Sequence, residues 1–127
     1  MKLLITGAGG QLGQALQGVV PGDVDVLAAS SVDLDIGDGG AVAAYLAAAK
    51  PDLVINAAAY TAVDKAESDV DAAFRINGDA VGFLARAAAA TGARFVHVST
   101  DFVFDGEAGR PYAPDAPTSP LGVYGAS

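Results

Sequence analysis

Three glycines near the start of the chain stand between an apolar run and an amphipathic segment. Gly7, Gly10 and Gly13 follow the run from Lys2 to Thr6 and open a stretch, Gln11 to Val19, whose apolar residues recur at helical spacing. A strand, a glycine turn and a helix in this order are typical of a phosphate-binding site. We therefore predict that the turn binds a pyrophosphate; the alternative is a plain tight turn.

Each residue of the turn has its own expected role. Gly7 permits the tight turn, Gly10 lets the backbone approach a pyrophosphate, and Gly13 lets the helix pack closely on the strand. The positive end of the helix dipole favours the negative charge of the phosphates. Gln11 and Leu12 are then expected to lie over a bound dinucleotide.

The rest of the chain alternates apolar strands with helices. Strands are expected at Val24–Ala28, Leu53–Asn56 and Arg94–Ser99, and helices at Gly40–Lys50 and Val63–Thr91, the last with a break near Ser68 and Asp69. This alternation implies right-handed crossovers into a parallel sheet, so we predict one doubly wound α/β domain over residues 1–127. The expected strand order is 3-2-1-4, with Phe95–Val98 at an open edge. Thr100–Pro120, with four prolines, is expected to be a long loop.

Charge and composition limit the partners that the chain can have. Fifteen acidic residues against seven basic ones give a net charge of −8, which would repel the phosphate backbone of a nucleic acid. Backbone N–H groups at a helix N-terminus still bind a small nucleotide without any basic side chain. There is no cysteine, no signal peptide and no apolar run that approaches about 18 residues. We expect a cytoplasmic protein without a membrane partner.

The residues after the second expected strand would meet the adenosine end of a dinucleotide. Ser30 and Ser31 include neither an acid for a ribose 2′-hydroxyl nor an arginine for a 2′-phosphate, so the choice between NAD and NADP stays open. Asp35 is placed to reach the adenine edge, together with Ile36. Asp33 is either a solvated loop acid or a helix cap.

Several other residues are assigned structural roles. Asn77 is a poor helix former inside a long helix, which favours a hydrogen bond to a neighbouring strand. His97 alternates with valines in an expected buried strand and has no metal-ligand partners, so it is expected to be structural. The charged residues Asp64, Lys65 and Glu67 are either a solvated helix start or part of a ligand edge. No cluster predicts a metal site.

Four segments taken together resemble the dTDP-4-dehydrorhamnose reductases, which are extended short-chain dehydrogenases with a Rossmann-type nucleotide-binding domain. They read TGAGGQLG at 6–13, DLDI at 33–36, NAAAYTAVDKAE at 56–67 and STDFVFDG at 99–106, and the resemblance runs over the whole chain. In sister families that epimerise or dehydrate nucleotide sugars, the fourth segment usually ends in Val-Tyr-Gly. The Phe104-Asp105-Gly106 ending therefore favours the reductase.

The resemblance implies an activity and a set of site residues. It implies reduction of the 4-keto group of dTDP-4-dehydro-6-deoxy-L-mannose to dTDP-L-rhamnose with NADPH or NADH, NADPH being slightly favoured. Thr100 would donate a hydrogen bond to the reacting oxygen and Tyr124 would be the general acid. Small residues would let the nicotinamide ribose approach the backbone at Ala57, Ala58, Ala59 and Tyr60. A dTDP-linked sugar is the expected partner, and a homodimer is an open expectation.

The last residues resemble the approach to a Tyr-x-x-x-Lys motif. Tyr124-Gly125-Ala126-Ser127 stops one residue before the lysine, so we expect the chain by itself to be almost inert as a reductase. The resemblance implies a longer protein whose further part binds the sugar. The alternative, drawn from the open edge strand, is a partner that covers this edge. Two other functions stay open: a non-catalytic dinucleotide-binding module, and a nucleotide-sugar epimerase or dehydratase.

Overall fold

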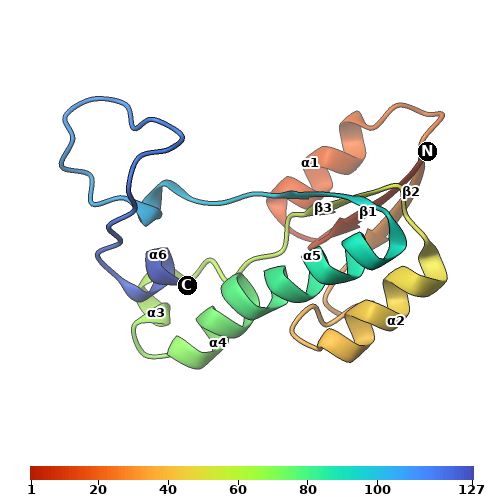
Figure 1. Cartoon of the computed structure of the whole chain (residues 1–127), viewed down its shortest axis with the longest axis horizontal. Helices are drawn as coiled ribbons and strands as arrows, with labels where there is room; N and C mark the ends of the chain where they lie inside the picture. Colours follow the sequence, from red (N-terminus) through yellow and green to blue (C-terminus); the bar gives the residue numbers. More distant parts are fainter.

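The computed structural model, which describes residues 1–127, is a parallel sheet with helices on both faces (Figure 1). Its four strands are β1 (Lys2–Thr6), β2 (Asp25–Ala29), β3 (Leu53–Asn56) and β4 (Arg94–His97). Its helices are α1 (Gln11–Val19), α2 (Gly39–Ala49), α3 (Val63–Ala66), α4 (Val70–Phe74), α5 (Ala80–Thr91) and α6 (Val123–Ala126). The predicted doubly wound α/β fold is confirmed, and most element boundaries lie within one or two residues of those expected.

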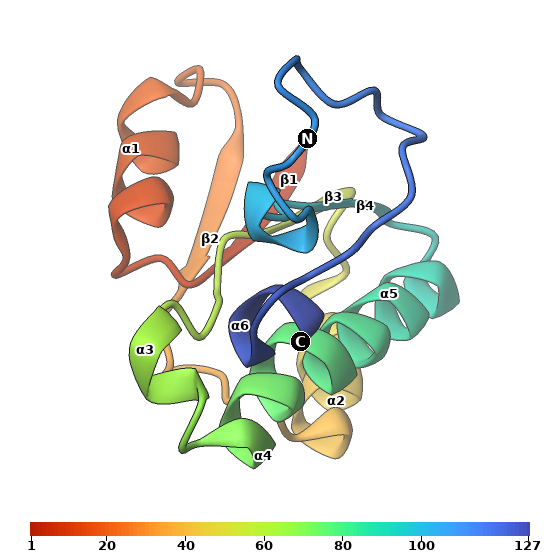
Figure 2. The same ribbon diagram turned by 90° about the vertical axis from the view of Figure 1, so that its left-hand side faces the viewer.

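The strand order is β2-β1-β3-β4, so the predicted order 3-2-1-4 is wrong. The reason is the face on which α2 lies. Helix α1 covers one face of the sheet, whereas α2 and α5 pack together on the other face (Figures 1 and 2). A right-handed crossover over the second face runs in the opposite direction from one over the first. The chain therefore passes from β2 back over β1 and places β3 on the far side of β1.

The main core lies between the sheet and the helix pair α2 and α5. Leu4 of β1 and Val54 of β3 are fully buried there, against Val42 and Leu46 of α2 and Leu84 of α5. Apolar side chains point to both faces of β1 and β3, as expected for parallel strands with helices on both sides. These two strands form the rigid centre from which the loops at their carboxyl ends emerge.

The segment expected to be one broken helix consists of three helices and a π-helical turn. The break near Ser68 and Asp69 is confirmed, because it separates α3 from α4. The π-helical turn, Arg75–Asp79, then joins α4 to α5. Wide turns of this kind are frequently found at functional sites. At the other end, Gly92 ends α5 with φ of +75°, a left-handed conformation that suits glycine.

Strand β4 is shorter and more exposed than expected. It ends at His97, and its side chains are half-buried or exposed, because β3 is its only neighbour in the sheet. The prediction that His97 lies in a buried strand is therefore wrong. The following loop contains one short 3₁₀ turn, Asp101–Val103, and leads to α6 beside α3 (Figure 2). None of the helices is both long and apolar enough to cross a membrane.

Candidate dinucleotide-binding site

The carboxyl ends of β1 and β3 lie side by side, and the chain leaves them in opposite directions. From β1 it turns to α1 on one face, and from β3 it turns towards the α5 side of the other face (Figure 1). Such a reversal opens a crevice at the strand ends, which is where open α/β sheets bind ligands. The glycine turn and the Ala57–Ala59 segment are the two walls of this crevice.

The glycine turn packs directly on the segment that follows β3. Gly7 has φ of +68°, and a Cβ at this position would lie 2.6 Å from the Ala58 Cα. A Cβ on Gly13 would overlap the Gly7 carbonyl oxygen and lie 2.8 Å from the Ala8 Cα. A Cβ on Gly10, by contrast, would meet only the Gly7 carbonyl oxygen, at 3.3 Å. Gly7 and Gly13 thus allow the close packing, while Gly10 lies exposed at the start of α1.

The N-terminus of α1 is left without a side-chain cap. Gly10 occupies the N-cap position and has no side chain that could accept a hydrogen bond from the first turn. The amide N–H groups of this turn therefore need an external acceptor. An anion at this end also gains from the helix dipole.

A first cavity of about 470 Å³ extends from the glycine turn to the loop after β2. Its lining residues are Gly7, Gly9, Gly10, Ser30, Ser31, Leu34, Asp35, Ile36, Ala57–Ala59 and Ile76. The Asp33 carboxylate accepts hydrogen bonds from the Ser30 hydroxyl at 2.6 Å and from the Ser30 N–H at 2.9 Å. These bonds lower the pKa of Asp33, the hydroxyl most. Asp33 is thus a loop acid, and Asp38 caps α2.

A second cavity of about 380 Å³ lies on the other side of the same wall. It contains both predicted catalytic residues, and it shares Ala57, Ala58 and Ala59 with the first cavity. Its lining residues are Leu12, Asn56–Ala59, Asn77, His97–Thr100, Val103 and Tyr124–Ser127. The two cavities therefore form two compartments that meet over the end of β3.

A chain of hydrogen bonds joins the ends of three strands beneath the second cavity. The buried Thr6 hydroxyl donates to the Asn56 Oδ1 at 2.6 Å, and the Ala58 N–H donates to the same oxygen at 3.1 Å. Asn56 Nδ2 lies 3.0 Å from His97 Nδ1. Because this amide nitrogen can only donate, His97 Nδ1 accepts, and the ring is neutral. The ring is also partly removed from water, and this desolvation lowers the pKa of His97.

Asn77 projects from the π-helical turn and holds the loop after β3. Its Oδ1 accepts from the Tyr60 N–H at 2.8 Å, and its Nδ2 donates to the Tyr60 carbonyl at 3.1 Å. The same Nδ2 lies 3.0 Å from the Ser127 hydroxyl oxygen. The predicted structural hydrogen bond therefore exists, but its partner is the loop after β3 rather than a strand. The link to Ser127 also ties this loop to the segment that carries Tyr124.

Tyr124 is held at the second cavity by contacts from two sides. Its ring packs edge-to-face on Phe102, with centroids 5.3 Å apart. A Cβ on Gly125 would overlap the Phe102 carbonyl oxygen, so glycine permits this approach. On the other side, the Glu67 carboxylate accepts the Val123 N–H at 2.8 Å. Sequence reasoning left the role of Glu67 open, and the structure makes it the anchor of α6.

Thr100 caps the 3₁₀ turn at the mouth of the second cavity. Its Oγ1 accepts from the Phe102 N–H at 3.2 Å, and its proton has only a long contact of 3.4 Å to Asp101. The hydroxyl hydrogen can therefore turn towards the cavity. Gln11, Gly13 and Tyr60 are the predicted site residues that line neither cavity.

Sequence reasoning missed Arg75, which forms an ion pair with the Asp35 carboxylate. It considered Asn56 and His97 separately, and missed the hydrogen bond that joins them at the second cavity. The sequence carries only one signal for such hydrogen bonds and ion pairs. It is a polar residue at a strand end, or in a helix next to a motif. No group of three or more His, Cys, Asp or Glu side chains is arranged to hold a metal ion.

Known proteins match the chain over its whole length. Residues 1–127 match the RmlD substrate binding domain family. The dTDP-4-dehydrorhamnose reductase of Burkholderia thailandensis is 52% identical over all of this chain and 43% of its own length. A reductase structure of the same description from Clostridium acetobutylicum superposes with a TM-score of 0.97 at 46% identity, covering 99% of this chain and 45% of that one.

A second solved structure was determined with a cofactor. The dTDP-4-dehydrorhamnose reductase of Bacillus anthracis, in complex with NADP, has a TM-score of 0.95 at 36% identity and covers 98% of this chain and 45% of that one. The chain thus spans less than half the length of the relatives it matches. Over that length the sequence and the fold agree, and the chain belongs to the RmlD family, as a homologue of the N-terminal part of dTDP-4-dehydrorhamnose reductases.

Proposed function

We propose that this chain is the NADPH- or NADH-binding part of a dTDP-4-dehydrorhamnose reductase, which reduces dTDP-4-dehydro-6-deoxy-L-mannose to dTDP-L-rhamnose. The observation that carries the proposal is the pair of cavities that meet over Ala57–Ala59. A dinucleotide has two ends joined by a pyrophosphate, and the uncapped start of α1 lies beside the first cavity. The adenosine end would lie in the first cavity and the nicotinamide end in the second.

The residues present fit such a cofactor. The open space at Gly9 and Gly10 leaves a cradle that any Cβ on Gly10 would begin to fill. Backbone N–H groups there would bind the pyrophosphate, so the net charge of −8 is no obstacle. Ser30 and Ser31 would face the adenosine ribose, and the small side chains after β3 would let the nicotinamide ribose approach the backbone.

In this proposal the chemistry takes place between Thr100 and Tyr124. When bound, the cofactor would supply a hydride to the sugar C4 carbonyl, whose oxygen would then carry negative charge. The Thr100 hydroxyl, whose hydrogen is free to turn to the cavity, donates a hydrogen bond to that oxygen. The Tyr124 hydroxyl delivers the proton that completes the alcohol. Val103 and Leu12 supply apolar surface that keeps water from this wall of the cavity.

Titration calorimetry of the chain with NADPH and NADH in parallel is the direct test. Binding is expected for at least one, and Gly10→Glu should abolish it because the added carboxylate fills and repels the phosphate site. Gly18→Glu is the matched control: it puts the same charge on the same helix at a place with no neighbour within 4 Å. Absence of binding to both cofactors, or equal loss in both variants, would contradict the proposal.

A second experiment separates the reductase from the other functions that the motifs leave open. A reductase consumes one reduced cofactor for each sugar, an epimerase or dehydratase returns the cofactor to its starting state, and a binding module does neither. Absorbance of the reduced nicotinamide during incubation with the 4-keto sugar distinguishes them in the protein that carries this chain. We expect the absorbance to fall with the unsubstituted protein and to stay constant with Tyr124→Phe.

A further inference from the structure

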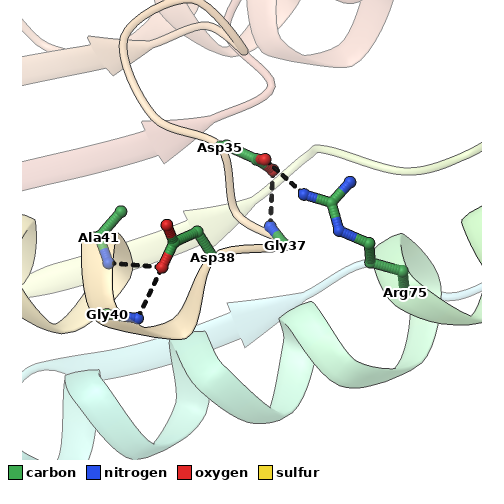
Figure 3. Close-up of polar contacts among 6 residues, drawn as sticks. All are labelled: Asp35, Gly37, Asp38, Gly40, Ala41 and Arg75. Atoms are coloured by element: carbon green, nitrogen blue, oxygen red, sulfur yellow. Dashed lines mark hydrogen bonds and ion pairs between the residues drawn. The ribbon is translucent and has the colours of Figure 1, made fainter.

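Two sides of the first cavity are joined by an ion pair between Arg75 and Asp35. Arg75 belongs to the π-helical turn after α4, and Asp35 lies in the loop after β2, forty positions earlier (Figure 3). An Nη2 hydrogen of Arg75 is donated to the Asp35 Oδ2, while the Gly37 N–H donates to Oδ1 at 2.9 Å. Each carboxylate oxygen is thus held by a different donor, and the carboxylate plane is fixed.

Gly37 supplies the space in which the guanidinium lies. A Cβ at this position would be 2.6 Å from both the Arg75 Cζ and Nε. Gly37 does not have a positive φ, so its backbone conformation does not require glycine. The close approach of Arg75 is therefore the feature of the structure that a larger residue at 37 would disturb.

The fixed carboxylate faces a cavity suited to a flat base. Leu34, Ile36 and Ile76 provide apolar surface, and Asp35 is the acid among the lining residues. Adenine carries an exocyclic amine that donates hydrogen bonds, whereas hypoxanthine carries a carbonyl oxygen at the same position. A carboxylate accepts from the amine and repels the carbonyl oxygen, so its direction decides how well the two bases are distinguished.

We infer that Arg75 is a positioning residue for base recognition: it holds the Asp35 carboxylate in the direction in which it selects adenine over hypoxanthine. The inference rests on the proposed dinucleotide site. The Asp35 side chain is 52% exposed, so without its anchors it would rotate among several directions. Aspartate is ionised at neutral pH in any case, so the contribution of Arg75 is orientation rather than charge state.

Binding of NADPH and of its hypoxanthine analogue, measured by calorimetry, tests this inference. One charge-assisted hydrogen bond predicts that the unsubstituted chain binds the adenine form about tenfold more tightly or better. In Arg75→Met this preference should fall by about threefold or more, because the carboxylate loses one anchor. Arg75→Lys should retain most of the preference. Arg86→Met, which removes an arginine that packs on Phe83, is the matched control and should retain all of it.

Gly37→Ala gives the same test without removing a charge. The three atoms nearest to the added methyl group all belong to the flexible Arg75 side chain, so the fold should persist while Arg75 is displaced. The preference for adenine should fall as in Arg75→Met. Asp35→Asn should abolish or reverse it, because an amide can also donate to the hypoxanthine oxygen.

The possible results distinguish a failure of the inference about Arg75 from a failure of the proposed dinucleotide binding. Equal weakening of both cofactors in Arg75→Met and Gly37→Ala, with the preference unchanged, would mean that the ion pair only braces the fold and would overturn the inference alone. Equal binding of the two cofactors by the unsubstituted chain would do the same. If neither cofactor binds the unsubstituted chain at all, the proposed function falls, and the inference with it.

Discussion

Asn77 clamps the backbone of Tyr60 at both its N–H and its carbonyl group, with hydrogen bonds of 2.8 and 3.1 Å. The two residues are seventeen positions apart, and the clamp joins the π-helical turn to the loop that leaves β3. This loop begins with Ala57–Ala59, the wall shared by the two cavities. The shape of the candidate site therefore depends on a side chain that stands behind it.

Asn77→Ala should lower the free energy of unfolding by about 2 kcal/mol, because it leaves the half-buried Tyr60 N–H without a partner. Urea unfolding followed by circular dichroism measures the change. Ser68→Ala, which removes a single exposed hydrogen bond to the Lys65 carbonyl, should cost less than about 0.5 kcal/mol. Similar losses in the two variants would show that the clamp does not hold the loop.

The glycines of the turn should respond differently to the same small change. Gly7→Ala should destabilise the fold by about 2 kcal/mol or more, since it combines a positive φ with a backbone clash, and Gly13→Ala should do so through the clash alone. Gly18→Ala, in open space on α1, should instead stabilise it by about 0.5 to 1 kcal/mol. Thermal melts of the three variants test this order, and a destabilised Gly18→Ala would contradict it.

The neutral His97 should make stability depend on pH. Its pKa is lowered in the fold from the ordinary 6.5, so just below that value the unfolded chain binds a proton that the folded chain does not. The His97 contribution is therefore complete above about pH 6.5 and decreases as the pH falls through the interval down to the folded pKa. Unfolding free energies at pH 7.5 and 5.5 should differ more in the unsubstituted chain than in His97→Gln. If the change in unfolding free energy between the two pH values is the same in both proteins, Asn56 does not select the neutral ring of His97.

Asp38 should stabilise α2 through its side chain. Its Oδ1 accepts the N–H groups of Gly40 and Ala41 at 2.9 and 3.0 Å (Figure 3). Asp38→Ala should cost about 1 kcal/mol, whereas Asp38→Ser, which keeps an acceptor, should cost a few tenths. Denaturant unfolding distinguishes the two, and an equal cost would mean that charge at the helix start matters more than capping.

The sequence predicts most closely those parts of the fold in which local signals agree. The strand from Lys2 to Thr6 and the helix from Gln11 to Val19 have the bounds expected, because the apolar run, the glycines and the helical period all indicate the same boundaries. The strand order was mispredicted because the face on which α2 lies depends on its packing with α5, which no local pattern carries. The alternation of His97 with valines predicts a buried strand, whereas its exposure follows from β3 being the only neighbour of β4 in the sheet.

In the candidate site, too, the sequence predicts the residues of local motifs but not the contacts between distant segments. The motif residues can be read as a pattern, and nine of them line the first cavity: Gly7, Gly10, Ser30, Ser31, Asp35, Ile36, Ala57, Ala58 and Ala59. The contacts that hold these residues in place cannot be predicted from a sequence pattern, because they join segments that are distant in the sequence. Arg75 with Asp35, Asn77 with Tyr60 and Glu67 with Val123 are pairs whose members lie on different loops and helices.

The wall at Ala57–Ala59 has a consequence for changing cofactor preference by design. A larger side chain at Ala58 would crowd the hydrophobic core against which Ala58 packs, and because Ala58 lines both cavities it would alter both compartments at once. Substitutions at Ser30 or Ser31 touch only the compartment beside β2. Libraries that aim to exchange one nicotinamide cofactor for the other should therefore vary the serines and keep the alanines constant.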